Sequence, residues 1–273
     1  MKTAMVLLTC NAGDKFEEVL RSHAFQSYTP DRRIVVDSES EDDTVEKAKK
    51  YSWEVVTEKR SSFNHGGTRQ KIAAMLLSQG FECVIMGTQD VVLAEKDTLE
   101  ILLESLRAHG AAAAYARQIP PEEKGMENFF RKRNYPEFSR VKSKEDIPEL
   151  GLFTAFCSDS LAAWDLQKIS AAGGFPETEF GEDMLLAAAL ILRGEKIVYC
   201  AESRCFHGHA NTLGELFRRG AAIGRMHAEH PELRRNFGGV GKYASKQLRG
   251  RDMLRFFLPL SAKYLGMLKG RFL

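Results

Sequence analysis

The sequence predicts an α/β fold in which a mostly parallel sheet is flanked by helices, and two patterns support this. Short aliphatic runs, typical of buried strands, alternate with amphipathic stretches at helical spacing over most of the chain. Strand, helix, strand, helix and strand follow one another within residues 1–58. The chain has 273 residues, 44% hydrophobic and 28% charged, which is enough for one large domain or two small ones and excludes a disordered composition.

The first half of the sheet is recognised by its aliphatic runs. AMVLLT is the first strand, and CNAGD leads from it into a helix that starts near Asp14, with Phe16 and Val19 on one face. RRIVVDS and WEVVTE are the second and third strands, with the helix TVEKAKKYS between them. RQKIAAMLLSQG is then a helix that ends at Gly80, and FECVIMGTQD is the fourth strand.

The second half repeats this pattern less regularly. TLEILLESLRAHG is a helix and AAAAYARQIP a strand. Residues 120–150 are polar, charged and interrupted by prolines, which predicts an excursion that is mobile or covers a substrate. After the apolar segment LFTAFCSDSLAAW, a helix begins near Glu182, and a last strand leads into FHGH.

Polar residues follow four of the predicted strands. Asn11, Asp37, His65 and Asp90 each come just past a strand end. Ligands of open parallel sheets bind outside the carboxyl ends of the strands. We therefore expect these four side chains to converge on one crevice.

The loop SSFNHGGTRQ, residues 61–70, combines hydrogen-bond donors with glycine. It follows the third strand and opens a helix, for which we expect Thr68 to be the start and the N-cap. The backbone N–H groups of Gly66 and Gly67 are also suited to approach an anion, with Arg69 supplying positive charge. We expect this loop to bind an anionic ligand and to hold no catalytic base.

Charge is distributed unevenly along the chain. Residues 218–273 hold 13 lysines and arginines against 3 acids, whereas residues 1–217 hold 26 against 34. Such a basic block predicts an anionic partner. Nucleic acid is not expected, because the rest of the chain is acidic. The five cysteines lack C-x-x-C spacing, which argues against a disulfide framework or zinc site and favours the cytoplasm.

In residues 246–273, leucines and phenylalanines are interspersed with lysines and arginines. No uncharged apolar run is long enough to span a membrane. We expect an amphipathic helical tail lying on an anionic membrane surface, kinked at Pro259. The alternative is a helix that packs on the domain or on a second subunit, as in a homodimer.

Seven segments, taken together and in order, resemble the family-2 glycosyltransferases and, within them, the rhamnosyltransferase-like group. They are LLTCNAGD, VVDSESEDDT, FNHGGTRQ, TQD, ARQ with RNYP, GGFPETEFGEDM and HGH, and they span residues 7–209. The resemblance implies a GT-A fold, a Rossmann-like nucleotide-sugar-binding domain, in residues 1–217. Residues 218–273 are then a basic helical C-terminal segment.

The resemblance implies that the donor binds at the strand ends and in the loop 61–70. The implied donor-binding residues are Thr9, Asn11, Ala12, Gly13, Asp37, His65, Gly66, Gly67, Arg69 and Gln89. Asp37 suits a hydrogen bond to a pyrimidine or ribose, although a carboxylate there also caps a strand-to-helix turn. The segment SESEDDT after Asp37 departs from the small residues and glycine usual in the family.

A metal site is implied by the TQD segment. Asp90 matches the last acid of the family's D-x-D motif, Thr88 replaces the first acid, and His207 is a second candidate ligand. One carboxylate and the phosphate oxygens of the donor would hold Mg²⁺ or Mn²⁺. A capping acid and a structural histidine are the alternatives.

The resemblance also implies the catalytic residues. Glu182 and Asp183 match the family's ED motif, with Asp183 as the general base and Glu182 supporting the acceptor. Acids at a helix start also serve as caps, which is the alternative. Trp164 is a candidate for stacking on the acceptor sugar, with core packing as the alternative.

An inverting glycosyltransferase is therefore implied. It would move a sugar, rhamnose in this subgroup, from a dTDP- or UDP-linked donor to a hydroxyl of a lipid-linked or cell-surface polysaccharide. It would be cytoplasmic and peripheral on the inner face of the plasma membrane. A non-catalytic nucleotide-sugar or glycan-binding module is the alternative, because the first D-x-D acid is missing and the SESEDDT segment is altered. An oxidoreductase is disfavoured, because TCNAGD lacks G-x-G-x-x-G.

Overall fold

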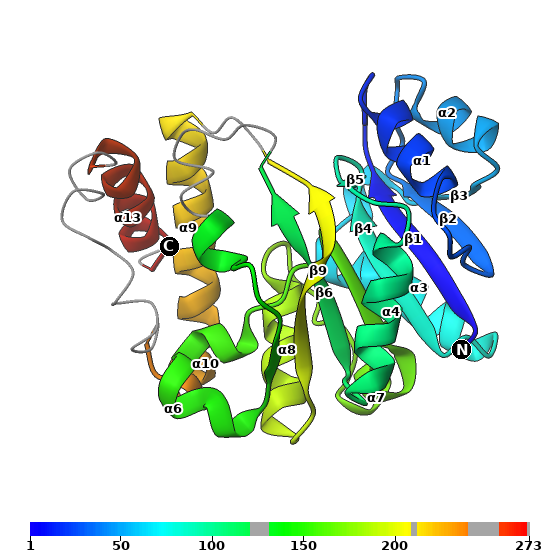
Figure 1. Ribbon diagram of the computed structural model, residues 1–273. Helices are drawn as coiled ribbons and strands as arrows, with labels where there is room; N and C mark the ends of the chain where they lie inside the picture. The colour runs from blue at the N-terminus through cyan, green and yellow to red at the C-terminus, as the bar shows by residue number, and fades with distance from the viewer. Residues whose placement is uncertain (121–130, 209–211, 240–256, 272–273) are drawn as a thin grey trace.

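The aliphatic runs of the sequence form the central sheet (Figure 1). The computed structural model describes residues 1–120, 131–208, 212–239 and 257–271. Within these residues, the sheet has the strand order β3-β2-β1-β4-β8-β6-β9-β5, and β7 pairs with β9. The strands are β1 (Thr3–Thr9), β2 (Arg32–Asp37), β3 (Glu54–Thr57), β4 (Cys83–Thr88), β5 (Val92–Leu93), β6 (Ala113–Ile119), β7 (Arg140–Lys142), β8 (Leu161–Asp165) and β9 (Ile197–Phe206).

Most strands of the sheet run in one direction. β3, β2, β1, β4, β6 and β9 are mutually parallel, whereas β8, β5 and β7 run against them. The carboxyl ends of β1, β2 and β4 are aligned: Thr9 of β1 pairs with Asp37 of β2, and Leu8 of β1 pairs with Thr88 of β4. The predicted α/β fold with a mostly parallel sheet is confirmed, and Asn11, Asp37 and Asp90 lie at its carboxyl edge.

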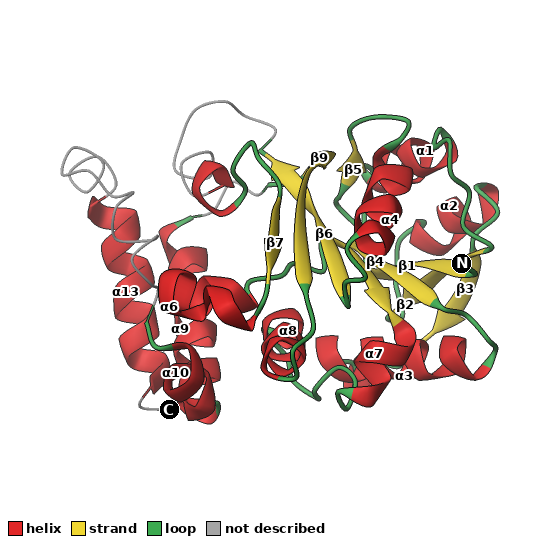
Figure 2. Cartoon of the chain, turned by 60° about the horizontal axis from the view of Figure 1, so that its bottom comes forward, coloured by secondary structure: helices red, strands yellow, loops and turns green. Residues whose placement is uncertain are grey.

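Both faces of the sheet are covered by helices. Val6 of β1 belongs to a core that includes α3, α7 and α8, and Met5 belongs to a core that includes α1, α2 and α4. Figure 2 shows these two helix layers on opposite sides of the sheet. Strands buried on both faces are continuously apolar, which explains the aliphatic runs. The helices are α1 (Phe16–Ala24), α2 (Thr44–Lys50), α3 (His65–Ser78), α4 (Thr98–Ala108), α7 (Leu166–Ala171) and α8 (Glu182–Leu192).

The start of α3 differs from the prediction. The helix begins at His65 rather than Thr68, and Asn64 is the N-cap, whose Oδ1 accepts a hydrogen bond from the Gly67 N–H at 2.6 Å. The prediction of Thr68 as start and cap is wrong, because the amide oxygen of Asn64 already satisfies the first turn. Thr68 instead lies buried within the helix.

The predicted excursion at residues 120–150 is partly structured. Residues 121–130 lie outside the described residues. Beyond β7, the chain forms η2 (Lys144–Asp146), α6 (Ile147–Leu150) and η3 (Gly151–Ala155) before it enters β8. These short elements lead to residues 156–160, which border the cavity described below.

The C-terminal region adds α9 (Leu213–Glu229), α10 (Pro231–Phe237) and α13 (Phe257–Arg271). In Figure 1, α13 lies beside α9, away from the sheet. The expected domain boundary after residue 217 falls within α9 and stays a prediction. Residues 246–256 of the predicted tail lie outside the described residues. Within the described ranges, no helix is both long and apolar enough to cross a membrane.

Candidate active site

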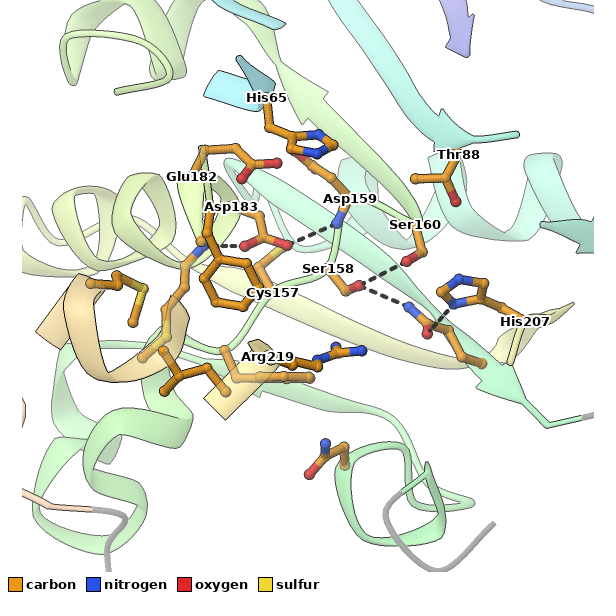
Figure 3. Close-up of a pocket in the computed structure, with 18 of the residues that line it drawn as sticks. His65, Thr88, Cys157, Ser158, Asp159, Ser160, Glu182, Asp183, His207 and Arg219 are labelled. Carbon is orange, nitrogen blue, oxygen red and sulfur yellow. Dashed lines mark hydrogen bonds between the residues drawn. The ribbon is translucent and has the colours of Figure 1, made fainter. Parts of the chain in front are cut away.

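A cavity of about 450 Å³ lies beyond the carboxyl edge of the sheet, between the sheet and the C-terminal helices. Its size suits a small-molecule site. α3 contributes His65, the start of α8 contributes Asp183, and the end of β9 is followed by His207 (Figure 3). The opposite wall comes from α9 and from Lys263 of α13. Segments far apart in the sequence therefore meet at this cavity.

Asp183 is held at the start of α8 by backbone donors. Its Oδ1 accepts a hydrogen bond from the Met184 N–H at 2.7 Å, and its Oδ2 accepts one from the Asp159 N–H at 3.2 Å. Burial, followed by the neighbouring charge of Glu182, raises the pKa of Asp183 to about 6. A carboxylate with this pKa is ionised at neutral pH and more basic than an ordinary aspartate, which suits a general base.

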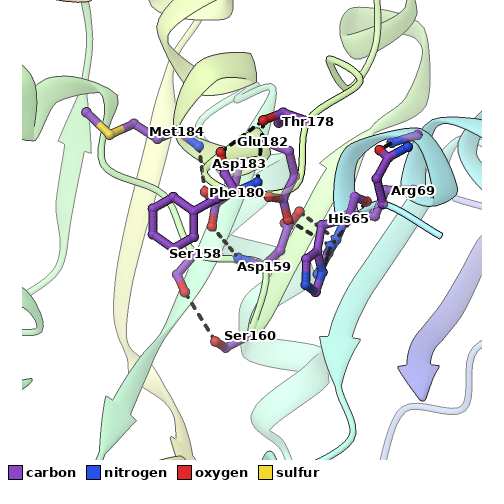
Figure 4. A network of polar contacts seen from close by, with 12 residues as sticks. His65, Arg69, Ser158, Asp159, Ser160, Thr178, Phe180, Glu182, Asp183 and Met184 are labelled. Carbon is purple, nitrogen blue, oxygen red and sulfur yellow. Dashed lines mark hydrogen bonds and ion pairs between the residues drawn. The ribbon is translucent and has the colours of Figure 1, made fainter. Parts of the chain in front are cut away.

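Asp183 lies beside two further carboxylates that are paired with Arg69, and we call Arg69, Asp159, Glu182 and Asp183 the base cluster (Figure 4). The Arg69 Nε lies 3.0 Å from the Asp159 Oδ2, and its Nη1 lies 2.7 Å from the Glu182 Oε1. Both ion pairs are buried, with Arg69 only 2% exposed. The cluster thus places one guanidinium among three carboxylates. The negative charge of Glu182 helps to keep Asp183 basic.

This arrangement corrects two predictions. Arg69 was expected to supply charge to a bound anion, but its guanidinium is buried and its charge is matched by Asp159 and Glu182. Trp164 was expected to stack on a sugar, but it is 0% exposed, and its indole N–H donates to the Asp159 Oδ1 at 2.7 Å. Both predictions are wrong. Arg69 and Trp164 instead hold Asp159 beneath the cavity.

The first turn of α3 corrects a third prediction. The Gly66 N–H donates to the Thr178 carbonyl oxygen at 3.0 Å, and the Gly67 N–H donates to Asn64. Neither N–H group is therefore free for an anion, and their predicted role is wrong. Gly66 is required for packing, because a Cβ there would lie 1.8 Å from the Pro176 carbonyl oxygen.

His65, by contrast, lines the cavity as expected. Its Nδ1 lies 3.3 Å from the Arg69 Nη1, which is always a donor. Desolvation of the ring and the nearby Arg69 charge lower the pKa of His65 to about 4, so the ring is neutral at neutral pH. With Nδ1 accepting from Arg69, we assign the ring proton to Nε2. His65 can thus donate a hydrogen bond to a ligand without adding charge.

Asp90 and His207, which we call the metal pair, lie together. The Asp90 Oδ2 is 3.3 Å from the His207 Nε2, and Thr88 donates to the Asp90 Oδ1 at 2.7 Å. On its other side, the His207 Nδ1 lies 2.8 Å from the Gln118 Oε1. With the proton on Nδ1, this contact leaves the lone pair of Nε2 directed beside the Asp90 carboxylate. Such orientation by an outer partner is usual for metal-binding histidines.

The metal pair fits a divalent cation that is completed by substrate. No set of three histidine, cysteine, aspartate or glutamate side chains forms a metal cluster in the described ranges. A carboxylate and an imidazole leave several coordination positions for phosphate oxygens and water, as is usual for Mg²⁺ and Mn²⁺. The predicted ligands Asp90 and His207 are therefore placed together, although binding of a metal stays a prediction.

The remaining predicted donor residues form two interlocked loops after β1 and β2. The Asp37 Oδ1 accepts from the Thr9 hydroxyl at 2.8 Å, and Asp37 is 2% exposed. The loop residues Asn11, Ala12 and Gly13 donate their backbone N–H groups to Ser40, Thr44 and Asp42, respectively. Asp37 thus serves the turn, as in the capping alternative, and contact of these residues with a nucleotide stays a prediction.

Gln89 bridges the ends of β1 and β4. Its Oε1 accepts from the Cys10 N–H at 2.8 Å, and its Nε2 donates to the Cys10 carbonyl oxygen at 3.3 Å. Its side chain is therefore already engaged by backbone. A direct contact with the donor stays a prediction.

Three residues of the site were missed in the sequence. Asp159 and Gln118 belong to the base cluster and to the support of the metal pair, and Arg219 enters from α9. The acid in CSDS and the glutamine in ARQ follow apolar runs, as the recognised acids do. That signal could have found the first two residues. Nothing local distinguishes Arg219 from Arg218.

Comparison with known proteins gives consistent relatives. The family model Glycosyl transferase family 2 matches residues 5–168. The O-antigen chain rhamnosyltransferase WbaN of Salmonella anatum is 39% identical over 242 residues, covering 87% of this chain and 76% of the relative. The O-antigen chain rhamnosyltransferase RfbN of Salmonella typhimurium is 38% identical over 244 residues, covering 88% of this chain and 77% of the relative.

Solved structures share the fold. The mannosyltransferase PcManGT from Pyrobaculum calidifontis, in complex with GDP-Man and Mn²⁺, has a TM-score of 0.64 at 17% identity, covering 97% of this chain and 73% of that chain. At this identity the likeness concerns the fold alone. It supports the arrangement of sheet and helices described above.

Proposed function

The chain belongs to glycosyl transferase family 2 and is a glycosyltransferase, and we propose that it transfers rhamnose from a nucleoside-diphosphate donor. The sugar is moved from a nucleotide sugar to a polysaccharide acceptor, as the two rhamnosyltransferase relatives indicate. The finer proposal is dTDP-rhamnose as donor and a hydroxyl of an O-antigen-type glycan as acceptor. The observation that carries the chemistry is Asp183, a carboxylate with raised pKa in the cavity wall.

We propose that Asp183 removes the proton from the acceptor hydroxyl. The hydroxyl oxygen then attacks the anomeric carbon, the bond from that carbon to the donor phosphate oxygen breaks, and the nucleoside diphosphate leaves with the electron pair. Attack opposite to the leaving group inverts the anomeric centre. Glu182 contributes indirectly, because its carboxylate is engaged by Arg69 and its charge raises the pKa of Asp183.

Asp90 and His207 would hold the divalent cation, with Thr88 and Gln118 orienting them. When bound, the cation would neutralise the negative charge that develops on the diphosphate as its bond to the anomeric carbon breaks. An imidazole ligand favours Mn²⁺ over Mg²⁺, since Mg²⁺ prefers oxygen ligands alone. His65 would donate a hydrogen bond to the donor from its neutral ring.

The cellular setting is also a proposal. Enzymes that extend lipid-linked glycans meet their acceptor at the membrane, and we propose that this chain works at the inner face of the plasma membrane. The outer surface of α13 supports this, because Tyr264 and Leu265 are 62% and 56% exposed, beside the exposed Lys269 and Arg271. A homodimer stays a further prediction.

The test is sugar transfer by the purified chain. We expect turnover with dTDP-rhamnose and an O-antigen oligosaccharide in the presence of Mn²⁺, loss of turnover with EDTA, and no turnover with GDP-mannose as a control donor. Product analysis by NMR would show inversion at the anomeric carbon. Tight dTDP binding without turnover on any acceptor would instead support the non-catalytic binding module.

A further inference from the structure

The C-terminal helices close the cavity on the side opposite the sheet. α9 contributes Leu216, Arg219 and Ile223, and α13 contributes Lys263. Figure 3 shows Arg219 across the cavity from Asp159 and Asp183, with its guanidinium pointing toward the side on which His207 lies. The region read in sequence as a separate basic tail therefore supplies part of the site's wall.

This wall is fixed by close packing of the two helices. Gly220 and Gly224 on α9 face the Lys263 and Met267 carbonyl oxygens, and a Cβ on either glycine would lie 2.1 Å from its oxygen. On α13, Gly266 and Gly270 meet the α9 backbone in the same way, at 2.1 and 2.0 Å. Because glycines with the same spacing interlock on both helices, α13 has little freedom to slide. Lys263 is held in register with α9, because its own carbonyl oxygen is the atom that Gly220 faces.

The charge of this wall is positive. Arg219 is solvent-exposed and forms no ion pair with a described residue, whereas Arg69 on the opposite side is matched by two carboxylates. His227, the third basic residue of the wall, is neutral at neutral pH, because burial and the nearby Arg271 lower its pKa. No acid of α9 or α13 lines the cavity. The positive charge of this wall is thus carried by Arg219 and Lys263, which both line the cavity.

We propose that Arg219 and Lys263 form a phosphate-binding subsite, which rests on the proposed function and extends it to the substrate's anionic group. A guanidinium matches two phosphate oxygens at once, and an ammonium adds a point charge. A neutral sugar would gain little from such a pair. Two sources supply this chemistry: the diphosphate of the donor, or a phosphate carried by a lipid-linked acceptor near the hydroxyl that reacts.

The experiment compares Arg219→Gln with Arg218→Gln. Arg218 is the neighbouring exposed arginine and does not line the cavity, so it is a matched control for net charge and for the helix. Lys263→Gln is a second subsite variant, and it is compared with the same Arg218→Gln control. Binding of pyrophosphate and of dTDP, both with Mn²⁺, is measured by calorimetry. Transfer kinetics use one oligosaccharide in two forms, with a reducing-end phosphate or with a neutral alkyl group.

Loss of a charge-assisted hydrogen bond should weaken binding about tenfold or more. If the subsite binds the diphosphate of the donor, Arg219→Gln should bind dTDP and pyrophosphate more weakly by this factor. An acceptor subsite predicts a KM raised about tenfold for the phosphorylated oligosaccharide and unchanged for the neutral one. In either case the Arg218→Gln values stay at those of the unchanged chain.

Equal values for Arg219→Gln and Arg218→Gln in every arm would overturn the subsite. Failure of the unchanged chain to transfer any sugar would overturn the proposed function instead. In that event calorimetric titrations with pyrophosphate and with the phosphorylated oligosaccharide still decide the subsite, because neither titration needs sugar transfer. A circular-dichroism melting curve of each variant checks that the fold is kept.

Discussion

The base cluster and the metal pair border one cavity but are built in opposite ways. The base cluster is buried, and its one guanidinium stands among three carboxylates, so its charges are unequal. In the metal pair, one carboxylate meets one imidazole, and each is oriented by an uncharged neighbour, Thr88 or Gln118. The base cluster makes the Asp183 carboxylate more basic. The neighbours of the metal pair only fix the orientation of the Asp90 and His207 side chains.

This difference indicates what each region needs from the fold. A general base needs a pKa near the working pH, which burial and like charge supply. Ligands of a cation need fixed orientation, while the cation itself brings the charge. Substitutions should therefore affect chemistry and stability in the base cluster, but affinity in the metal pair.

The largest effect is expected for Asp183→Asn. An amide cannot accept the acceptor's proton, so kcat should fall about 10²- to 10⁴-fold, with the dTDP affinity unchanged. Glu177→Gln is the matched control, because Glu177 is exposed and lies outside the cavity lining. Steady-state kinetics and calorimetry measure both quantities. An Asp183→Asn variant that kept a tenth of the rate would place the base elsewhere.

Arg69→Gln should damage stability. It leaves Asp159 and Glu182 buried without a counter-charge, which typically costs about 3–5 kcal/mol. Arg32→Gln is the comparison: its ion pair with Glu54, at 2.6 Å, is partly exposed, and its loss should cost about 1 kcal/mol or less. Urea unfolding of both variants tests this. Equal losses would show that the base cluster contributes no more than a surface ion pair.

Gln118→Leu should weaken Mn²⁺ binding about 10- to 100-fold, because His207 loses the acceptor that fixes its ring. Gln118→Glu retains an oxygen acceptor and should bind Mn²⁺ nearly as well as the unchanged chain. Titration of Mn²⁺ in the presence of dTDP, followed by electron paramagnetic resonance, measures the affinity. The idea is refuted if both variants bind Mn²⁺ equally.

The smallest effect is a shift in pH dependence. Asp183 acts as a base only when ionised, and its pKa is raised to about 6, so kcat/KM should fall as the pH drops through about 6. Glu182→Gln removes a negative charge that raises this pKa, and the midpoint should move to lower pH. The shift is measured by determining kcat/KM of the unchanged chain and of Glu182→Gln between pH 4.5 and 8, at about ten pH values each. A midpoint that moves upward would contradict the assigned direction.

Much of the fold could be predicted because each signal is local. The aliphatic runs identified β1, β2 and β4, and glycine identified the end of α3, where Gly80 has φ 77°. Asp183 and the metal pair were found by motif, and the structure places them at one cavity or beside it. The predicted anion contact of the Gly66 and Gly67 N–H groups in the loop 61–70 was wrong. The sequence does not show whether the N–H groups of two adjacent glycines face a ligand or another part of the protein.

Sequence alone determined the α/β class, the parallel strand ends and the family, since each depends on residue order and on hydrophobic spacing. Only the tertiary structure decided which charges meet. Arg69 and Asp159 are separated by 90 positions in the chain, yet their ion pair matches the charge of Arg69, and the Trp164 indole N–H donates to the same carboxyl group. The interlocking glycines likewise bring α13 to the cavity. Electrostatic and packing contacts depend on distance in space, which residue order does not encode locally.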